Sequence, residues 1–119
     1  MERLLLNSRD ELLRIETAKI VYFEADGNYT NIVMTNKLKF ALGVNLSGVE
    51  RMLAERLKDR AGLFARVGKS YIVNLSYVTA INVLKRRLVL SDFEHFAFSI
   101  EISKEALKKL KDIITKIKI

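Results

Sequence analysis

The chain contains no cysteine and no proline, and only one of its 119 residues is a histidine. Without thiols, disulfide bridges and thiolate metal sites are excluded, and a reducing cytoplasmic setting is permitted. Long apolar segments are also missing, because purely apolar runs reach only three or four residues and a membrane-spanning helix needs about 20. The first residues show no signal-peptide pattern. We therefore expect a cytoplasmic protein that does not enter a membrane.

Catalytic motifs are lacking as well. The single imidazole, His95, falls in a strand-like run, which favours a surface or packing role over general base or ligand. The glycines fit neither a phosphate-binding loop nor a dinucleotide fingerprint. Glu24 and Asp26 are neighbours, but they lack the further Asp, Asn or His ligands that a metal site requires. We expect no enzyme activity, no cofactor and no metal.

Length and composition predict one folded domain over residues 1–119. A chain of this size buries roughly two-thirds of its unfolded surface, which is enough for a core without covalent cross-links. Hydrophobic residues make up 50% of the sequence and charged residues 29%, as in folded soluble proteins and unlike disordered ones.

Positive charge is concentrated in the second half of the sequence. The formal net charge is +7, with an isoelectric point near 9.8. Residues 1–59 hold nine basic and nine acidic side chains, whereas residues 60–119 hold twelve basic and five acidic ones. This asymmetry favours a polyanionic partner such as nucleic acid over an acidic protein or an anionic membrane, although a solvated basic face without a partner stays open.

Short apolar stretches separated by turn residues predict a chain made mostly of antiparallel strands. Turn formers lie at 7–10, 26–28, 36–37, 85–86 and 91–94. The predicted strands are 3–6, 11–15, 20–25, 29–34, 38–42, 64–67, 72–73, 78–84, 87–90 and 95–98.

Two helices interrupt or follow these strands. Ser47 and Glu50 have the spacing of a capping box. The short helix that they begin would bury Val49, Met52, Leu53 and Leu57. Ser103 is expected to cap a final, lysine-rich helix. The side chains of this helix predicted to face the body are Leu107, Leu110, Ile113, Ile114 and Ile117.

Three polar corners could contact an anionic partner. Gly68 permits a sharp bend between apolar pieces, so Lys69 and Ser70 are left to donate outward. The turn over 26–31 offers amide and hydroxyl groups, although ordinary turn chemistry also explains them. Lys104 opposes the dipole of the final helix, and an external anion would relieve this unfavourable contact.

These segments together resemble the LytTR family of bacterial DNA-binding domains, found at the C-terminal ends of many response regulators. The resemblance covers nearly the whole chain. It is carried by residues 20–29, by the spacing to the helix led by Leu46, and by residues 64–74 and 102–104. It implies a mainly β fold: an elongated antiparallel β-sheet sandwich with one short internal helix and a C-terminal helix.

The resemblance also implies how the chain binds double-stranded DNA. Family members insert loops into successive major grooves, at paired repeats upstream of promoters, and bend the duplex. Each domain would be a monomer in isolation and a dimer on DNA, downstream of a receiver domain and a histidine kinase; this chain contains no receiver domain. Transferred by position, the DNA-binding residues are Asn28, Tyr29, Thr30, Asn31, Gly68, Lys69, Ser70, Ser103 and Lys104.

Departures from the family pattern at three positions affect base reading. The family commonly has His at the position of Gly68 and Arg at the positions of Lys69 and Lys104. Lysine lacks arginine's planar fork, so base identity would be read less sharply or differently. Arg66 and residues 85–87 would add positive field.

Two other functions fit the composition. In a β-rich single-strand binder, Tyr29 and Tyr71 would stack on bases, although their positions in apolar strands favour core packing. A protein-interaction module would use the basic face to hold an acidic partner and would show no preference among DNA sequences.

Overall fold

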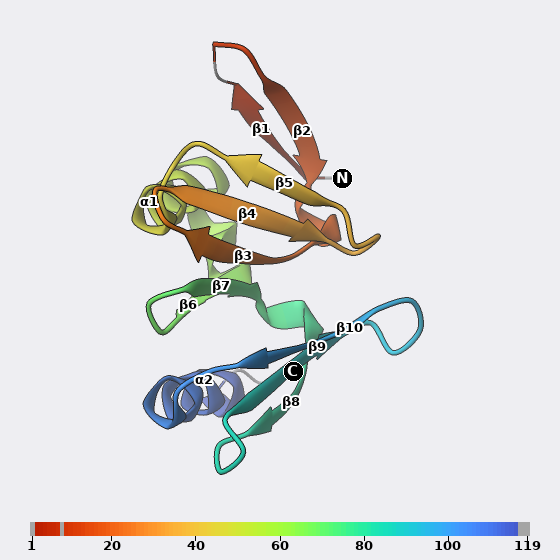
Figure 1. The fold of residues 1–119 in the computed structure, drawn as a ribbon, viewed down its shortest axis with the longest axis vertical. Coiled ribbons are helices and arrows are strands. Elements are labelled where there is room, and N and C mark those ends of the chain that lie inside the picture. Colours follow the sequence, from red (N-terminus) through yellow and green to blue (C-terminus); the bar gives the residue numbers. More distant parts are fainter. Residues whose placement is uncertain (1, 8, 117–119) are drawn as a thin grey trace.

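The strands form three antiparallel sheets that follow one another along the long axis of the molecule (Figure 1). A computed structural model describes residues 2–7 and 9–116, with extents of 44 × 31 × 27 Å. The sheet orders are β1-β2, β5-β4-β3-β7-β6 and β10-β9-β8. The expected mainly β, elongated antiparallel fold with two helices is confirmed.

The strands are β1 (Arg3–Asn7), β2 (Leu12–Glu16), β3 (Ile20–Asp26), β4 (Tyr29–Met34), β5 (Lys39–Leu42), β6 (Phe64–Val67), β7 (Tyr71–Asn74), β8 (Val78–Asn82), β9 (Arg87–Ser91) and β10 (Ala97–Glu101). The α-helices are α1 (Leu46–Leu57) and α2 (Lys104–Lys116). Short 3-10 turns at Thr17–Lys19, Lys58–Leu63 and Leu75–Tyr77 connect elements and were not predicted from the sequence.

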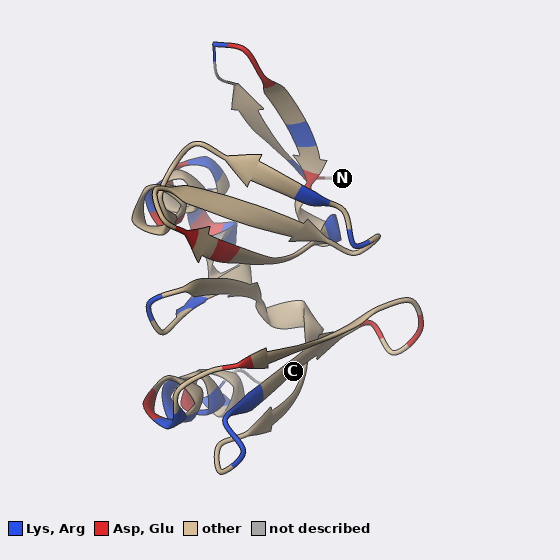
Figure 2. Ribbon diagram, viewed as in Figure 1, with Lys and Arg blue, Asp and Glu red and all other residues tan. Residues whose placement is uncertain are grey.

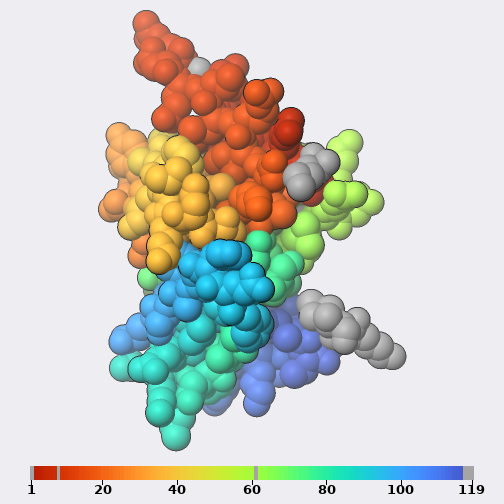
Figure 3. All heavy atoms as spheres, turned by 90° about the vertical axis from the view of Figure 1, so that its right-hand side faces the viewer, coloured from red at the N-terminus to blue at the C-terminus, as the bar shows by residue number. Residues whose placement is uncertain are grey.

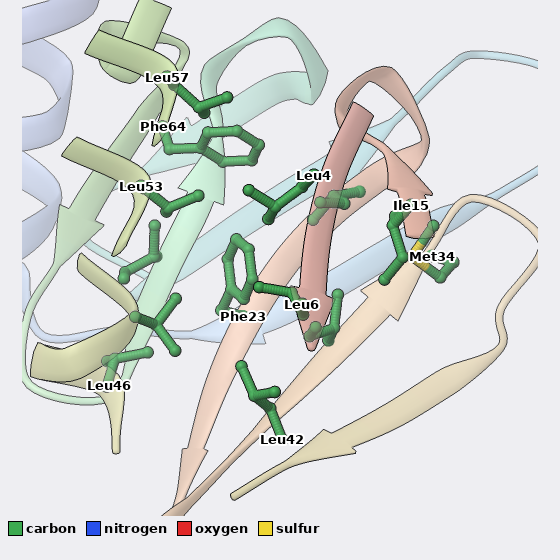
Figure 4. Close-up of a cluster of buried hydrophobic side chains, with 14 residues drawn as sticks. Leu4, Leu6, Ile15, Phe23, Met34, Leu42, Leu46, Leu53, Leu57 and Phe64 are labelled. Atoms are coloured by element: carbon green, nitrogen blue, oxygen red, sulfur yellow. The ribbon is translucent and has the colours of Figure 1, made fainter. Parts of the chain in front are cut away.

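The five-stranded sheet is the middle layer, and its alternating side chains supply two separate cores. On one face, Phe23, Ile32 and Ile72 are buried under α1 and the β1-β2 hairpin (Figure 4). On the other face, Val33 and Val73 pack with the three-stranded sheet and α2. Because this sheet is covered on both faces, its polar side chains reach solvent mainly at the strand ends, which is where the candidate site lies.

Helix α1 confirms the predicted apolar face but begins earlier than the capping box suggested. Asn45, not Ser47, is the N-cap, and its Oδ1 accepts a hydrogen bond of 2.8 Å from the Gly48 amide. An asparagine directly before the apolar periodicity competes well for this position. Glu50 is free to form a different contact, described below.

In the second half of the chain, strands β8 and β10 differ most from the prediction. Strand β8 ends at Asn82 instead of residue 84, because the Asn82 side chain accepts from the Lys85 amide and begins a turn. The expected strand over 95–98 starts at Ala97. Asp92 Oδ1 accepts from three successive amides, at residues 94–96, and holds His95 in an exposed loop.

Helix α2 has the predicted cap and a narrower buried face. Ser103 Oγ accepts a hydrogen bond of 3.3 Å from the Ala106 amide, which confirms the N-cap. Leu107 and Leu110 are buried, whereas Ile113 is 42% exposed, contrary to prediction. Ile114 is half-buried against the same core, so the body covers the later turns of the helix less closely than the first ones. The prediction for Ile117 falls outside the described residues.

No helix in the described part of the chain has the length and apolar character needed to cross a membrane.

Candidate nucleic-acid interface

Three chain reversals lie on one side of the molecule, at the left of Figure 1. They are the β3-β4 turn, the β6-β7 turn and the link from β10 into α2. Strands β3 and β6 are both antiparallel to β7 in the middle sheet, so their ends lie at the same edge of that sheet. Strand β10 of the three-stranded sheet runs toward the same side of the molecule (Figure 1). The three predicted groups of site residues, separated by up to 76 positions in the sequence, therefore share one edge.

The β6-β7 turn presents Lys69 and Ser70 to solvent, and both are exposed. Gly68 adopts φ +67°, a left-handed conformation that glycine tolerates best. The Ser70 carbonyl accepts a hydrogen bond of 2.8 Å from the Ala25 amide on β3. This bond extends the pairing of β3 and β7 into the turn and fixes the backbone beside the exposed side chains.

The Arg66 side chain links the same turn to helix α1. Its Nη2 donates to the Lys69 carbonyl at 3.0 Å, while Nη1 lies 3.2 Å from both Ser47 Oγ and Glu50 Oε1 on α1. The sequence suggested that Arg66 adds positive field. In the structure its charge is paired with Glu50, and the guanidinium ties α1 to the turn. Nothing in the local sequence pattern could have identified this pairing across 16 residues.

The β3-β4 turn divides its four predicted residues between surface and interior. Gly27 has φ +60°, and Asn28 and Tyr29 are exposed. Asn31 is half-buried and donates to Asp26 Oδ2 at 3.4 Å.

Thr30 is the member of this group that does not reach the surface. It is 0% exposed, and its Oγ1 donates to the Val44 carbonyl at 2.7 Å. Thr30 is one of the predicted DNA-binding residues, but its burial and this bond place it to support the loop from within. Strand alternation explains the outcome, because Thr30 points to the α1 side of the middle sheet, as Ile32 does.

A cleft of about 680 Å³ separates the β6-β7 turn from the start of α2. A Cβ built on Gly68 would stand 3.6 Å from the Cβ of Ala106, so turn and helix approach closely at its base. Ser103 and Lys109 line the helix side of the cleft, together with Glu105. Lys109 was not among the site residues predicted from the sequence. Its spacing of three from Ala106 places the two residues on one helix face, but only the fold shows that this face lines the cleft.

Lys104 opens α2 and is exposed at the same edge. Glu105 follows it in the first turn, where its negative charge suits the helix dipole. The cation on Lys104 opposes that dipole, and the described residues give it no acidic partner within ion-pair distance.

The Tyr71 side chain contacts other residues of the protein through both its hydroxyl and its ring. Its hydroxyl donates to Glu24 Oε2 at 3.1 Å, and its ring packs edge-on against Tyr22. Burial, followed by the Glu24 charge, raises the pKa of Tyr71 to about 12, so the hydroxyl stays protonated. Of the two tyrosines considered for base stacking, only Tyr29 is substantially exposed, at 58%.

Charged side chains of both signs occur on each side of the molecule, and cations lie at two of the three reversals. Figure 2 shows Lys and Arg at the β6-β7 turn, along α2 and at the β8-β9 turn. The β9-β10 loop on the opposite side carries the acidic Asp92 and Glu94. This loop lies near the centre of the face shown in Figure 3, whereas the three reversals lie at the opposite side of the molecule in Figure 1. The cationic reversals and the acidic loop therefore face different directions.

Comparison with solved structures finds the same fold in a LytTr DNA-binding domain of a putative methyl-accepting/DNA response regulator from Bacillus cereus. The TM-score is 0.65 at 21% identity, over 96% of this chain and 97% of that one. No curated protein matches the chain. The family model described as LytTr DNA-binding domain matches residues 10–115. With nearly its whole length matched, the chain belongs to the LytTR family of DNA-binding domains.

Proposed function

We propose that this domain binds double-stranded DNA in a sequence-dependent manner by placing its three chain reversals in successive major grooves. These reversals, called tips below, are the β3-β4 turn, the β6-β7 turn and the link from β10 into α2. The observation that carries the proposal is the shared edge on which Asn28, Lys69 and Lys104 are exposed. Each tip belongs to a different element, and each is held by backbone pairing or a helix cap. A rigid frame with few donors suits recognition, because little conformational entropy is lost on binding.

The tips differ in the contacts they can make. Lys69 and Lys104 donate to guanine O6 and N7 or to phosphate oxygens, and Ser70 reaches either kind of acceptor. Asn28 offers an amide that pairs with adenine. Tyr29, Asn31, Gly68 and Ser103 complete the surface, whereas Thr30 holds the first loop from within.

In this proposal the domain is the output part of a cytoplasmic transcription regulator and has no catalytic activity of its own. A receiver domain answering to a histidine kinase would control it. Two copies would occupy paired repeats near a promoter, while the isolated domain stays monomeric. Family membership supports this assignment.

Selection of binding sites from a random duplex pool tests sequence dependence directly. We expect one enriched motif, present as a pair when the pool is long enough. If about five phosphates are neutralised, log affinity falls with log salt at a slope near −4.5. A pool without an enriched motif, or binding insensitive to salt, would refute the proposal.

Lys69→Ala tests the central tip. We expect a loss of about 1–3 kcal/mol in binding free energy and a changed preference at one base if Lys69 reads that base. Lys39→Ala is the matched control, because Lys39 is an exposed lysine on the edge strand β5. A small, uniform loss across all sequences would reassign Lys69 to a phosphate.

The two rival functions are separated in the same experiments. A single-strand binder would prefer single strands to the duplex at equal salt and would lose affinity in Tyr29→Ala. A module for acidic proteins would bind all duplexes alike. Either result would replace the present proposal.

A further inference from the structure

The tip of the β8-β9 hairpin carries an exposed leucine beside cationic residues. Residues 83–86 connect Asn82 to its strand partner Arg87, and within this turn Leu84 is 81% exposed. Lys85 and Arg86 follow it and are also exposed. One exposed leucine on a surface is ordinary. An exposed leucine at the apex of a cationic hairpin is a shape that DNA-bending proteins use.

The backbone of this turn is fixed. The Lys85 amide donates to Asn82 Oδ1 at 2.9 Å, and the Arg86 amide donates to the Val83 carbonyl at 3.2 Å. Arg86 adopts φ +53°, a left-handed conformation that few residues other than glycine adopt. Leu84 is thus presented on a preformed frame and does not need to be ordered when a partner binds.

The hairpin tip is joined to the candidate interface. The Ile102 amide donates to the Arg86 carbonyl at 3.0 Å, and Ile102 directly precedes the site residues Ser103 and Lys104. The turn is therefore connected directly to the start of α2. In Figure 1 it marks the end of the molecule beyond α2, on the long axis along which the three tips are spread.

We propose that the β8-β9 tip enters the minor groove at one end of the bound site, where Leu84 wedges between two base pairs. This inference rests on the proposed binding of duplex DNA. Lys85 and Arg86 would contact the phosphates and walls of the groove, whose negative potential attracts them most where the groove is narrow. A turn that served only as a phosphate contact would gain nothing from an exposed leucine. Insertion buries this side chain and kinks the duplex.

The assay uses the duplex selected by the wild-type chain, with 2-aminopurine placed at successive positions along both flanks. We expect wild-type protein to increase fluorescence at one flanking step, because an unstacked base is less quenched. Energy transfer between dyes on the two duplex ends reports the bend. Leu84→Ser should abolish the fluorescence increase, reduce the bend and weaken binding about tenfold. The enriched motif at the other tips should stay the same.

Phe93→Ser is the matched control, because Phe93 is 83% exposed at a positive φ in the β9-β10 loop, on the opposite face. It should leave affinity, bend and fluorescence unchanged. Thermal unfolding verifies that both variants fold.

The wedge is refuted if Leu84→Ser matches the wild type in fluorescence and bend, or if Phe93→Ser has the same effect. It is also refuted if only the loss of Lys85 or Arg86 weakens binding, since the turn is then a phosphate contact. Failure of duplex binding itself is a separate result, visible when wild-type protein enriches no motif in the pool selection.

Discussion

Replacing Arg66 tests whether the central tip is held in place by the protein or by contact with DNA. Arg66 donates to Ser47, Glu50 and the Lys69 carbonyl at 3.0–3.2 Å. The Glu50 side chain is 55% exposed, so the ion pair contributes at most about 1 kcal/mol to folding. The bond to the Lys69 carbonyl adds about 1 kcal/mol. We expect Arg66→Gln to destabilise the fold by about 1–2 kcal/mol.

The effect on DNA binding follows from the freed turn. Ordering even one residue on binding costs about 1–2 kcal/mol, so affinity should fall by about tenfold. Fluorescence anisotropy with the selected duplex, measured over a series of salt concentrations, gives both affinity and slope. If Arg66 is a brace, the slope is unchanged. If Arg66 instead neutralises a phosphate, the slope becomes shallower by about 0.9.

Glu50→Gln separates the two explanations, because they predict opposite changes in affinity for DNA. Removing a negative charge near a DNA-contacting arginine would strengthen binding, whereas removing half of a brace weakens it. We expect weaker binding, by about two- to fivefold, since Ser47 and the Lys69 carbonyl still hold Arg66. Stronger binding by Glu50→Gln, or a shallower slope in Arg66→Gln, would refute the brace.

Three further changes test other parts of the structure. Thr30→Val leaves the Val44 carbonyl without its buried donor and should lower the free energy of unfolding by about 1–2 kcal/mol in urea titration, without changing the enriched motif. Gly68→Ala should lower the free energy of unfolding by about 1 kcal/mol because of backbone strain at φ +67°, since the added Cβ would make only an ordinary contact. Gly62→Ala is the control, because Gly62 has open space around it and no positive φ, and thermal unfolding should show no comparable loss. Desolvation would raise the pKa of Asp92, but hydrogen bonds from the amides of 94–96 outweigh it and hold that pKa well below its usual range. The resulting stabilisation is present above the unfolded pKa of about 3.9 and is lost as the pH falls further. In urea titrations, the difference in free energy of unfolding between the wild type and Asp92→Asn should therefore shrink below about pH 4.

The prediction of strands from sequence succeeded where apolar residues alternate between clear turn signals. It failed at boundaries that side chains set. Strand β8 ends early at Asn82 and β10 begins late after Asp92, because each of these side chains carries an oxygen that accepts hydrogen bonds from amides of the following residues. Asn45 displaced Ser47 as the cap of α1 for the same kind of reason. Such hydrogen bonds depend on local geometry, which residue spacing alone does not specify.

Residue types and their order determined the mainly β class, the two helices, the basic second half and the positions of the three polar corners. The resemblance carried by residues 20–29 and 64–74 indicated the family. The tertiary structure decided which corner residues are available: strand alternation turned Thr30 inward, and Glu50 on α1 captured Arg66. It also placed Lys109 beside the central turn and joined the Leu84 hairpin to the start of α2. These outcomes depend on contacts between residues far apart in the chain, and only packing of the folded layers brings such residues together.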